Sequence, residues 1–233
     1  MSGDPSVIVC ANACEANEKL LSIAAKFGMQ NQKKGMHPIF IIVPDRFTLQ
    51  AEKILLTHAP VLLNVRVVTF SMLFHIISPN TDVLDKTSAV LFMWRAIRDV
   101  RGELGHFGSC VDQYAFAEKM FNTINQLESS RADFKTLEKN ARSAVTKQKM
   151  RDISLIHARY KELCKGTIDS SGVLGWMIDN VAKSEIIKDA HVYVTGFEYV
   201  SIQREEVLKR IAGVARSFTV GARAGCELLG QLV

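Results

Sequence analysis

The sequence predicts an α/β fold in which a parallel sheet, covered by helices on both faces, is interrupted by an all-helical insertion. Short apolar runs rich in β-branched residues alternate with helical apolar spacing over residues 6–77, and this alternation returns after residue 190. Such alternation is typical of parallel strands joined by crossover helices. Between the two regions, residues carry only helical spacing. We therefore expect an α/β domain over residues 1–78 and 186–233 and a helical insertion over residues 79–185.

The first region contains three strand–helix pairs. Strands are predicted at residues 6–11, 38–44 and 65–70, and helices at residues 15–27, 48–59 and 72–77. Pro38 and Pro44 bound the second strand, because proline cannot extend a central hydrogen-bonded ladder. Ser71 is placed to cap the third helix. We expect the first strand to lie in the interior of the sheet.

Four apolar stripes at helical spacing run through the insertion, and they include Trp94, Phe121, Tyr160 and Met177. Stripes of this kind are typical of a helical core rather than of cofactor contacts. After the insertion a strand at residues 191–195, a helix at 203–212 and a strand at 217–220 are predicted. The tail over residues 221–233 has no predicted partner.

Composition excludes several classes of protein. Hydrophobic residues make up 48% and charged residues 23% of the 233, as in soluble globular proteins. The N-terminus lacks a basic signal region, and the apolar runs are too short to span a bilayer, so we expect a cytoplasmic protein without membrane contact. The five cysteines never form a C-x-x-C pair and the six histidines show no ligand spacing, which predicts neither a metal site nor a catalytic motif.

Positive charge is concentrated in the insertion. Residues 131–151 carry seven basic and two acidic side chains, an excess of 7 − 2 = +5 that equals the net charge of the whole chain. A local basic surface attracts polyanions such as nucleic acid. A charge run is also typical of a solvated helix face, so both interpretations stay open.

The turn after the first strand is where a nucleotide phosphate would bind in this kind of fold. A working phosphate loop reads G-x-x-x-x-G-K-[ST], with glycines that let the backbone curl, a lysine for charge and a hydroxyl for Mg²⁺. Here both glycine positions are alanine, the lysine position is Asn17 and the hydroxyl position is Glu18. The degenerate loop consists of Ala11, Asn12, Ala13, Cys14, Glu15, Ala16, Asn17 and Glu18.

Nucleotide hydrolysis lacks its second requirement as well. An ATPase needs an acidic pair at the end of a later strand to position Mg²⁺ and water. The returning strand instead continues through Thr195 and Gly196 to Phe197 and Glu198. We predict that the chain binds no nucleotide, metal or other cofactor. The alternative is a P-loop-type NTPase or helicase domain with an atypical nucleotide loop.

Three segments, at residues 39–53, 67–74 and 190–197, resemble the superfamily 1 helicase fold as found in the AddB subunit of bacterial AddAB-type helicase-nucleases. The first is similar to that family's Val-Pro-Glu/Asp-x-Phe-Thr segment at the place of helicase motif Ia. The second resembles its Ser/Thr-Phe-Ser-x-Leu segment, and the third its Tyr-Ile-x-Gly-Phe strand. The departure is the first turn, where many members keep a phosphate loop.

The resemblance implies a P-loop/helicase-like sheet (1A-like) with a 1B-like helical insertion. It also implies a non-hydrolysing scaffold domain, without activity of its own, from the AddB-type subunit of an ATP-dependent helicase/deoxyribonuclease that acts in DNA double-strand break repair and recombination. The implied partners are single-stranded or unwinding DNA and an AddA-type motor helicase-nuclease. Family members are several-fold longer, with a second helicase-like domain and a nuclease domain, so we expect an excised domain or a truncated product.

The resemblance implies DNA contact for six residues, because of their positions in the first two of these segments. They are Arg46, Phe47, Thr48, Thr69, Phe70 and Ser71. The polar side chains can donate to phosphates and the rings can stack on bases. Equally, the two rings can belong to the core and the hydroxyls can cap helices. A further alternative is a protein-docking module without DNA affinity, which predicts an exposed apolar patch.

Overall fold

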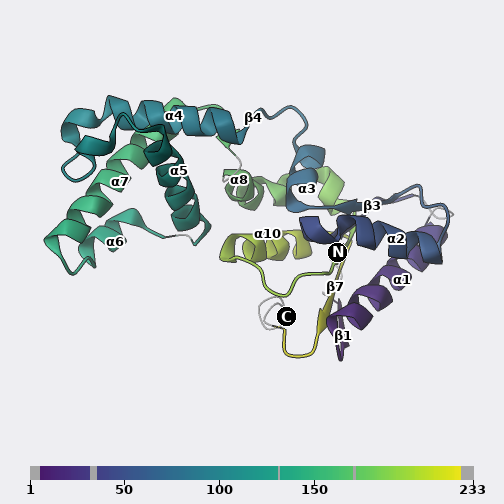
Figure 1. The fold of residues 1–233 in the computed structure, drawn as a ribbon. Helices are drawn as coiled ribbons and strands as arrows, with labels where there is room; N and C mark the ends of the chain where they lie inside the picture. The colour runs from purple at the N-terminus through teal and green to yellow at the C-terminus, as the bar shows by residue number, and fades with distance from the viewer. Residues whose placement is uncertain (1–5, 32–35, 131, 170–171, 227–233) are drawn as a thin grey trace. The chain divides into compact units, whose positions relative to one another are not determined.

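The structure, a computed structural model, describes residues 6–31, 36–130, 132–169 and 172–226 (Figure 1). It divides into two compact units: a sheet unit of Met1–Pro79 and Leu174–Val233, and a helical unit of Asn80–Val173. The sequence places residues 174–185 in the insertion, whereas the structure groups them with the sheet unit. One contact that holds them there is the Trp176 ring, which packs edge-on against Phe74 with ring centres 5.1 Å apart.

The sheet unit contains five parallel strands in the order β1-β7-β6-β2-β3, so the predicted parallel α/β fold is confirmed. The strands are β1 (Ser6–Cys10), β2 (Ile39–Ile42), β3 (Val65–Val68), β6 (His191–Val194) and β7 (Ser217–Arg223). The main helices of this unit are α1 (Ala13–Asn31), α2 (Thr48–His58), α3 (Phe70–Ile77) and α10 (Ile202–Ala212). Shorter helices are η1 (Asp45–Phe47), η4 (Val181–Lys183) and α9 (Glu185–Lys188), and α8 (Gly172–Asn180) begins at the end of the helical unit.

Both faces of the sheet are covered by helices, which explains why β2 reads as a continuous apolar run. All four β2 residues are buried. Ile39 and Ile41 pack in one cluster with Leu20 of α1 and Leu55 of α2. Successive strand residues point to opposite faces, so Phe40 and Ile42 face the other side, where α10 contacts β7.

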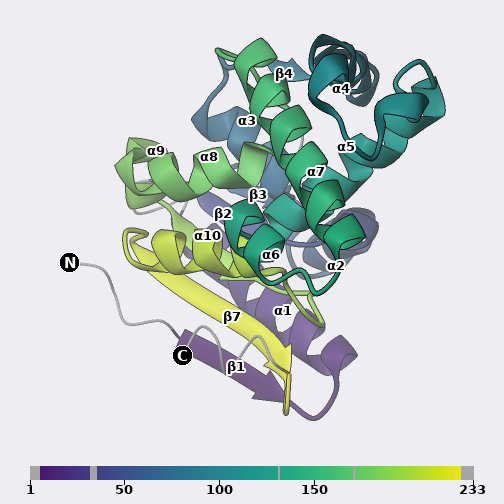
Figure 2. The same cartoon turned by 90° about the vertical axis from the view of Figure 1, so that its left-hand side faces the viewer.

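The prediction that the first strand lies in the sheet interior is wrong for the part of the chain that the structure describes. There, β1 pairs with β7 alone and forms an edge (Figure 2). The crossover through α1 carries the chain to β2, and β7 and β6 fill the space between. Val9 of β1 is 51% exposed, as an uncovered edge strand allows, and Cys10 is its buried residue.

Two local predictions also need correction. Helix α3 begins at Phe70, and its cap is Thr69, whose hydroxyl accepts a hydrogen bond from the Met72 N–H at 3.3 Å; Ser71 therefore lies inside the first turn. The prediction that the tail lacks a partner from residue 221 onward is wrong for its first residues. There β7 continues to Arg223, because Gly221, Ala222 and Arg223 pair with β1.

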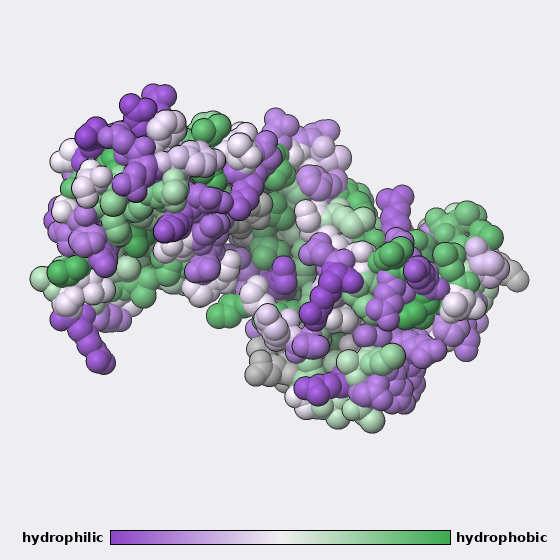
Figure 3. All heavy atoms as spheres, viewed as in Figure 1, coloured by the Kyte–Doolittle hydropathy of each residue, from purple (hydrophilic) through white to green (hydrophobic). Residues whose placement is uncertain are grey.

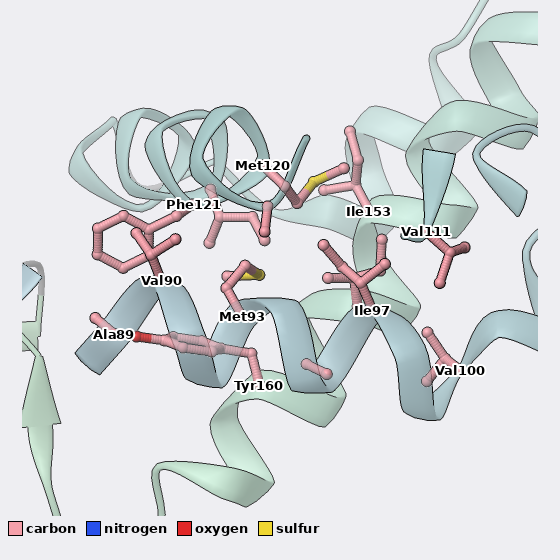
Figure 4. Close-up of a cluster of buried hydrophobic side chains, with 14 of the residues drawn as sticks. Ala89, Val90, Met93, Ile97, Val100, Val111, Met120, Phe121, Ile153 and Tyr160 are labelled. Carbon is pink, nitrogen blue, oxygen red and sulfur yellow. The ribbon is translucent and has the colours of Figure 1, made fainter. Parts of the chain in front are cut away.

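The helical unit has one apolar core between its three longest helices (Figure 4). They are α4 (Lys86–Asp99), α5 (Tyr114–Ser129) and α7 (Ala144–Leu163), accompanied by α6 (Phe134–Lys139), η2 (Arg101–Glu103) and η3 (Gly108–Cys110). Met93, Ile97, Phe121 and Ile156 are among its fully or almost fully buried members. Three of the four predicted apolar stripes thus meet in this core; the fourth, through Met177, belongs to the sheet unit.

The sequence predicts no strand in the insertion, but the structure has two short ones. Strands β4 (Val83–Leu84) and β5 (Ile168–Asp169) form a parallel pair. Asp169 is 4% exposed and accepts hydrogen bonds from the Tyr160 hydroxyl at 2.6 Å and the Gly172 N–H at 2.7 Å. Strands of two residues are too short for a period-two pattern, which is why the sequence does not reveal them.

A second buried carboxylate organises the loop between η2 and η3. Asp152 of α7 is fully buried. It accepts hydrogen bonds from the backbone N–H groups of Gly105, His106 and Phe107 at 3.1, 2.7 and 3.0 Å, and from the Gln148 side chain at 2.9 Å. One side chain thereby fixes the loop against α7.

Candidate functional site

A cavity of about 260 Å³ lies at the carboxyl ends of the strands in the sheet unit. Helix α2 follows β2 on one face of the sheet, whereas α10 follows β6 on the other, so the loops after these neighbouring strands diverge. Divergence of this kind creates the crevice in which α/β sheets bind ligands. The cavity is lined by Ala13, Asn17, Arg46, Phe47, Gln50, Gly196, Phe197, Glu198, Gly221, Ala222, Arg223 and Cys226.

The turn between β1 and α1 contains two residues, Ala11 and Asn12. Helix α1 begins at Ala13, so most of the degenerate loop is helical. The Asn12 side chain accepts a hydrogen bond from the Glu15 N–H at 2.8 Å, and its carbonyl accepts one from the Ala16 N–H at 3.2 Å. Asn12 therefore satisfies the N–H groups of Glu15 and Ala16, and its side chain acts as an asparagine cap.

Asn17, at the lysine position of a phosphate loop, connects α1 to the end of β6. Its side-chain oxygen accepts hydrogen bonds from the Thr195 hydroxyl at 2.7 Å and from the Gly196 N–H at 3.1 Å. Thr195 is fully buried. The side chain is thus committed to a contact inside the protein.

The segment after β2 presents Arg46 at the mouth of the cavity. Pro44 accepts a hydrogen bond from the Phe47 N–H at 2.8 Å, and the Thr48 hydroxyl donates to the Asp45 carbonyl at 3.0 Å. These bonds hold η1 as a tight turn. The Arg46 side chain is 73% exposed, whereas Phe47 is half-buried against the cluster between the sheet and α1 and α2.

The segment after β3 is largely structural. Thr69 caps α3, and Phe70 is 7% exposed. The Phe70 ring lies 5.9 Å from that of Phe197, and the Arg204 guanidinium lies 5.6 Å from its centre. Of the candidate residues in this segment, Ser71 is exposed.

Gly196 allows the β6 loop to approach Phe47. Its φ is +82°, a conformation that other residues rarely adopt. A Cβ added there would lie 2.9 Å from the Phe47 ring and 3.1 Å from Pro44. Glycine is therefore required at this position by backbone conformation and by space.

We expect Gly196→Ala to lower the free energy of unfolding by about 2–3 kcal/mol, because it adds backbone strain to a steric clash. Urea unfolding of the full chain measures the loss. The matched control is Gly175→Ala in α8, where an added Cβ would meet open space and alanine favours the helix. Equal stability of the two variants would contradict this account of Gly196.

Charged groups around the cavity are mostly basic. Arg46 pairs with Glu198 at 3.9 Å, but both side chains are more than 70% exposed, so the pair contributes little to stability. Arg223 makes no ion pair with any described residue. Two arginines therefore face solvent around one glutamate, and the site can attract an anion.

The basic run of the helical unit surrounds the start of α7. The members whose side chains the structure describes are Lys139, Arg142, Lys147, Lys149 and Arg151, and none of them forms an ion pair with a described carboxylate. Arg131 and the Lys135 side chain lie outside the described residues. The five cations are thus available to a polyanion.

The described residues contain neither a candidate metal site nor a disulfide bond. No group of three histidine, cysteine or acidic side chains there could hold a metal ion, and all five cysteines are free thiols. Every helix in this part of the chain is too short or too polar to cross a membrane.

Comparison with known proteins gives a consistent result. The sequence profile of the family described as "ADDB, N-terminal" matches residues 20–226. The match begins at Leu20, so the turn between β1 and α1 lies outside it.

Individual relatives share one name, which identifies each as the B-type subunit of an ATP-dependent helicase/deoxyribonuclease. The protein of Lachnoclostridium phytofermentans is 27% identical over 77% of this chain, and that of Listeria welshimeri is 27% identical over 81%. The protein of Staphylococcus haemolyticus is 26% identical over 78% of this chain. In each case the chain spans 17% of the relative's length.

Proposed function

The chain belongs to the AddB N-terminal family, and on this basis we propose that it is the N-terminal helicase-like domain of an AddB-type subunit of an ATP-dependent helicase/deoxyribonuclease. In this role it acts in DNA double-strand break repair and recombination, together with an AddA-type motor helicase-nuclease. The proposal rests on the family match over residues 20–226 and on relatives that carry that name.

The domain acts as a scaffold that does not hydrolyse ATP. The main support for a domain that does not hydrolyse ATP is that the Asn17 side chain, at the lysine position of a phosphate loop, is hydrogen-bonded to Thr195 and Gly196. In addition, α1 begins at Ala13, so residues 13–18 form no open loop that could curl around phosphates. Glu15 lies in the first turn of α1, where its negative charge interacts favourably with the helix dipole. Glu18 lies one turn further along, and both carboxylates would repel a phosphate.

Isothermal titration with Mg²⁺-ATP tests this scaffold role directly. We expect no heat of binding for the full chain. Binding that is lost on changing Asn17 or Glu18 would instead support the alternative, an NTPase with an atypical loop.

Single-stranded DNA binds along the carboxyl ends of the strands, through phosphate contacts with Arg46, Ser71 and Arg223. Arg46 and Ser71 are exposed in the segments after β2 and β3, and Arg223 is the exposed last residue of β7. Thr48, Thr69 and Phe70 support the same segments from within, and Phe47 supports the β6 loop. Arginine and hydroxyl groups are typical phosphate donors.

Fluorescence anisotropy with a labelled oligothymidylate, repeated across salt concentrations, tests the DNA contact. We expect binding that weakens with salt, and a double variant, Arg46→Ala with Arg223→Ala, that binds roughly tenfold more weakly and with a salt slope smaller by about 2. Arg210→Ala is the matched control, because Arg210 lies in the last turn of α10, which leads to the amino end of β7. Absent or salt-independent binding would contradict DNA contact by this domain.

A second candidate function, protein docking, is favoured by one observation. Several large apolar side chains are exposed around β3, on a part of the sheet unit other than the strand-end cavity.

A further inference from the structure

The edge of the sheet formed by β3, opposite to the edge formed by β1, has an apolar groove beside it. A cavity of about 480 Å³ lies between α2 and α3, directly beside the edge strand β3. Its lining is apolar on the α2 side, through Leu55 and Leu56, and on the α3 side, through Met72 and Ile76. Val65, Val67 and Val68 of β3 form its floor.

The backbone of β3 is open toward this groove. The Asn64 and Val68 carbonyls accept hydrogen bonds from the Ile39 and Val43 N–H groups of the β2 segment. In a parallel pair, alternate residues direct both backbone groups to the same neighbour. Val65 and Val67 therefore direct their N–H and C=O groups outward, where no described strand pairs with them.

Exposed apolar side chains gather around this edge. Among the residues that the structure describes, fifteen large hydrophobic side chains are exposed, and five of them lie between residues 49 and 72: Leu49, Leu56, Val61, Leu63 and Met72. Their exposed fractions range from 48% to 70%. Figure 3 shows green apolar surface over the region that Figure 1 labels α2 and β3. Apolar patches of this kind mark interaction sites.

We propose that the outer edge of β3 binds an extended segment of a partner protein, which adds a strand to the sheet in the groove between α2 and α3. Main-chain hydrogen bonds to Val65 and Val67 give affinity, and alternate apolar side chains enter the two halves of the groove. This inference does not depend on DNA contact, because the edge is separate from the strand-end cavity.

The charges beside the groove define the segment further. Glu52 lies on the α2 side, and Arg66 lies on the sheet face opposite to that of Val65 and Val67. An added strand is thus covered on both faces, and strands of this kind are rich in consecutive β-branched residues. The expected segment combines such residues with an acidic side chain facing Arg66 and a basic one facing Glu52.

A second copy of this chain fits less well than a partner. An antiparallel pair of β3 strands that used both Val65 and Val67 would be centred on Arg66. The two Arg66 side chains would then lie directly opposite each other, and like charges in that position are destabilising.

The test uses the full chain and a fluorescein-labelled peptide of consecutive β-branched residues between a lysine and a glutamate. We expect anisotropy to report binding of this peptide, and about tenfold weaker binding of a copy N-methylated at alternate residues, which cannot form the ladder. Val65→Pro removes one outward N–H without touching the bonds to β2, so it should weaken binding similarly while the chain stays folded.

A second variant keeps the test decisive if Val65→Pro does not fold. Leu56→Arg places a charge in the groove at a side chain that is 57% exposed, and Leu91→Arg, 48% exposed in α4 of the helical unit, is its control. Loss of peptide binding in the first alone supports the proposal. Equal binding of the peptide and its N-methylated copy would overturn it. Self-association in light scattering that Val65→Pro abolishes would assign the edge to a second copy and would also overturn it.

Discussion

Asp152→Ala is expected to lower the free energy of unfolding of the helical unit by about 3 kcal/mol, because hydrogen bonds to a buried charge are strong and their loss leaves donors without a partner. The carboxylate accepts bonds from three consecutive backbone N–H groups and from Gln148. The substitution removes the acceptor of all four hydrogen bonds at once. Urea unfolding gives the loss, and hydrogen exchange should show faster exchange at Gly105, His106 and Phe107.

A matched control separates this loss from a general effect of removing an acid. Asp112→Ala, in the same unit, breaks an exposed ion pair with Arg101 at 3.5 Å, so it should change stability by about 0.5 kcal/mol or less. Similar losses in the two variants would refute the role of Asp152 in fixing the loop.

The same carboxylate makes stability depend on pH. Burial raises the pKa of Asp152, but the hydrogen bonds from Phe107, His106, Gln148 and Gly105 outweigh it and hold the pKa below its ordinary value. Because the folded pKa is the lower one, the stabilisation is complete above the unfolded value and disappears as pH falls through the folded value. Asp152→Asn should therefore lose less stability than the wild-type chain on acidification.

Tyr160→Ala should lower the free energy of unfolding by about 3–5 kcal/mol, the range found when a large buried side chain is truncated. Tyr160 is 1% exposed, packs against Phe121 with ring centres 6.2 Å apart, and donates its hydroxyl to Asp169 (Figure 4). Its removal leaves a cavity in the core and deprives the buried Asp169 carboxylate of one of its hydrogen-bond donors. Thermal unfolding followed by circular dichroism measures the effect.

Two further variants divide the Tyr160 effect into its parts. Tyr160→Phe keeps the ring and removes only the hydroxyl, so it should cost about 1–3 kcal/mol. Tyr114→Ala removes a tyrosine that is 46% exposed, and it should cost less than about 1 kcal/mol. If Tyr114→Ala proved as damaging as Tyr160→Ala, burial could not be the cause.

The strands that the sequence predicts correctly are those whose burial is visible in their residues. The run Ile39–Ile42 is apolar throughout because helices cover both faces of β2. The order of the strands in the sheet, by contrast, depends on pairing between segments that are far apart in the sequence. Nothing in the apolar run of β1 distinguishes an edge strand from an interior one, and Gly221 and Ala222 carry no strand pattern although they pair with β1.

The candidate site is predictable where residue identity alone decides its chemistry. Alanine, asparagine and glutamate in the first turn predict the lack of a phosphate loop, but not that Asn17 bonds to Thr195, 178 positions away. Arg223 is missed because it is the last residue of β7, whereas the strand pattern in the sequence ends three residues earlier, at Val220. Thr69 and Ser71 are equally plausible caps, and the burial of Phe70 under Phe197 and Arg204 starts the helix at the earlier residue.

The parallel pairing of β4 with β5 has a consequence for how such a chain can evolve. Val83 lies opposite Ile168, and the Asp82 carbonyl accepts a hydrogen bond from the Ile168 N–H at 3.2 Å, so the entry and exit of the insertion are adjacent. Because its two ends are adjacent, the insertion can be accommodated without a change in the distance between the flanking elements of the sheet unit. Gene segments that encode it can be gained, enlarged or deleted between β3 and β6 while the sheet keeps its strand order.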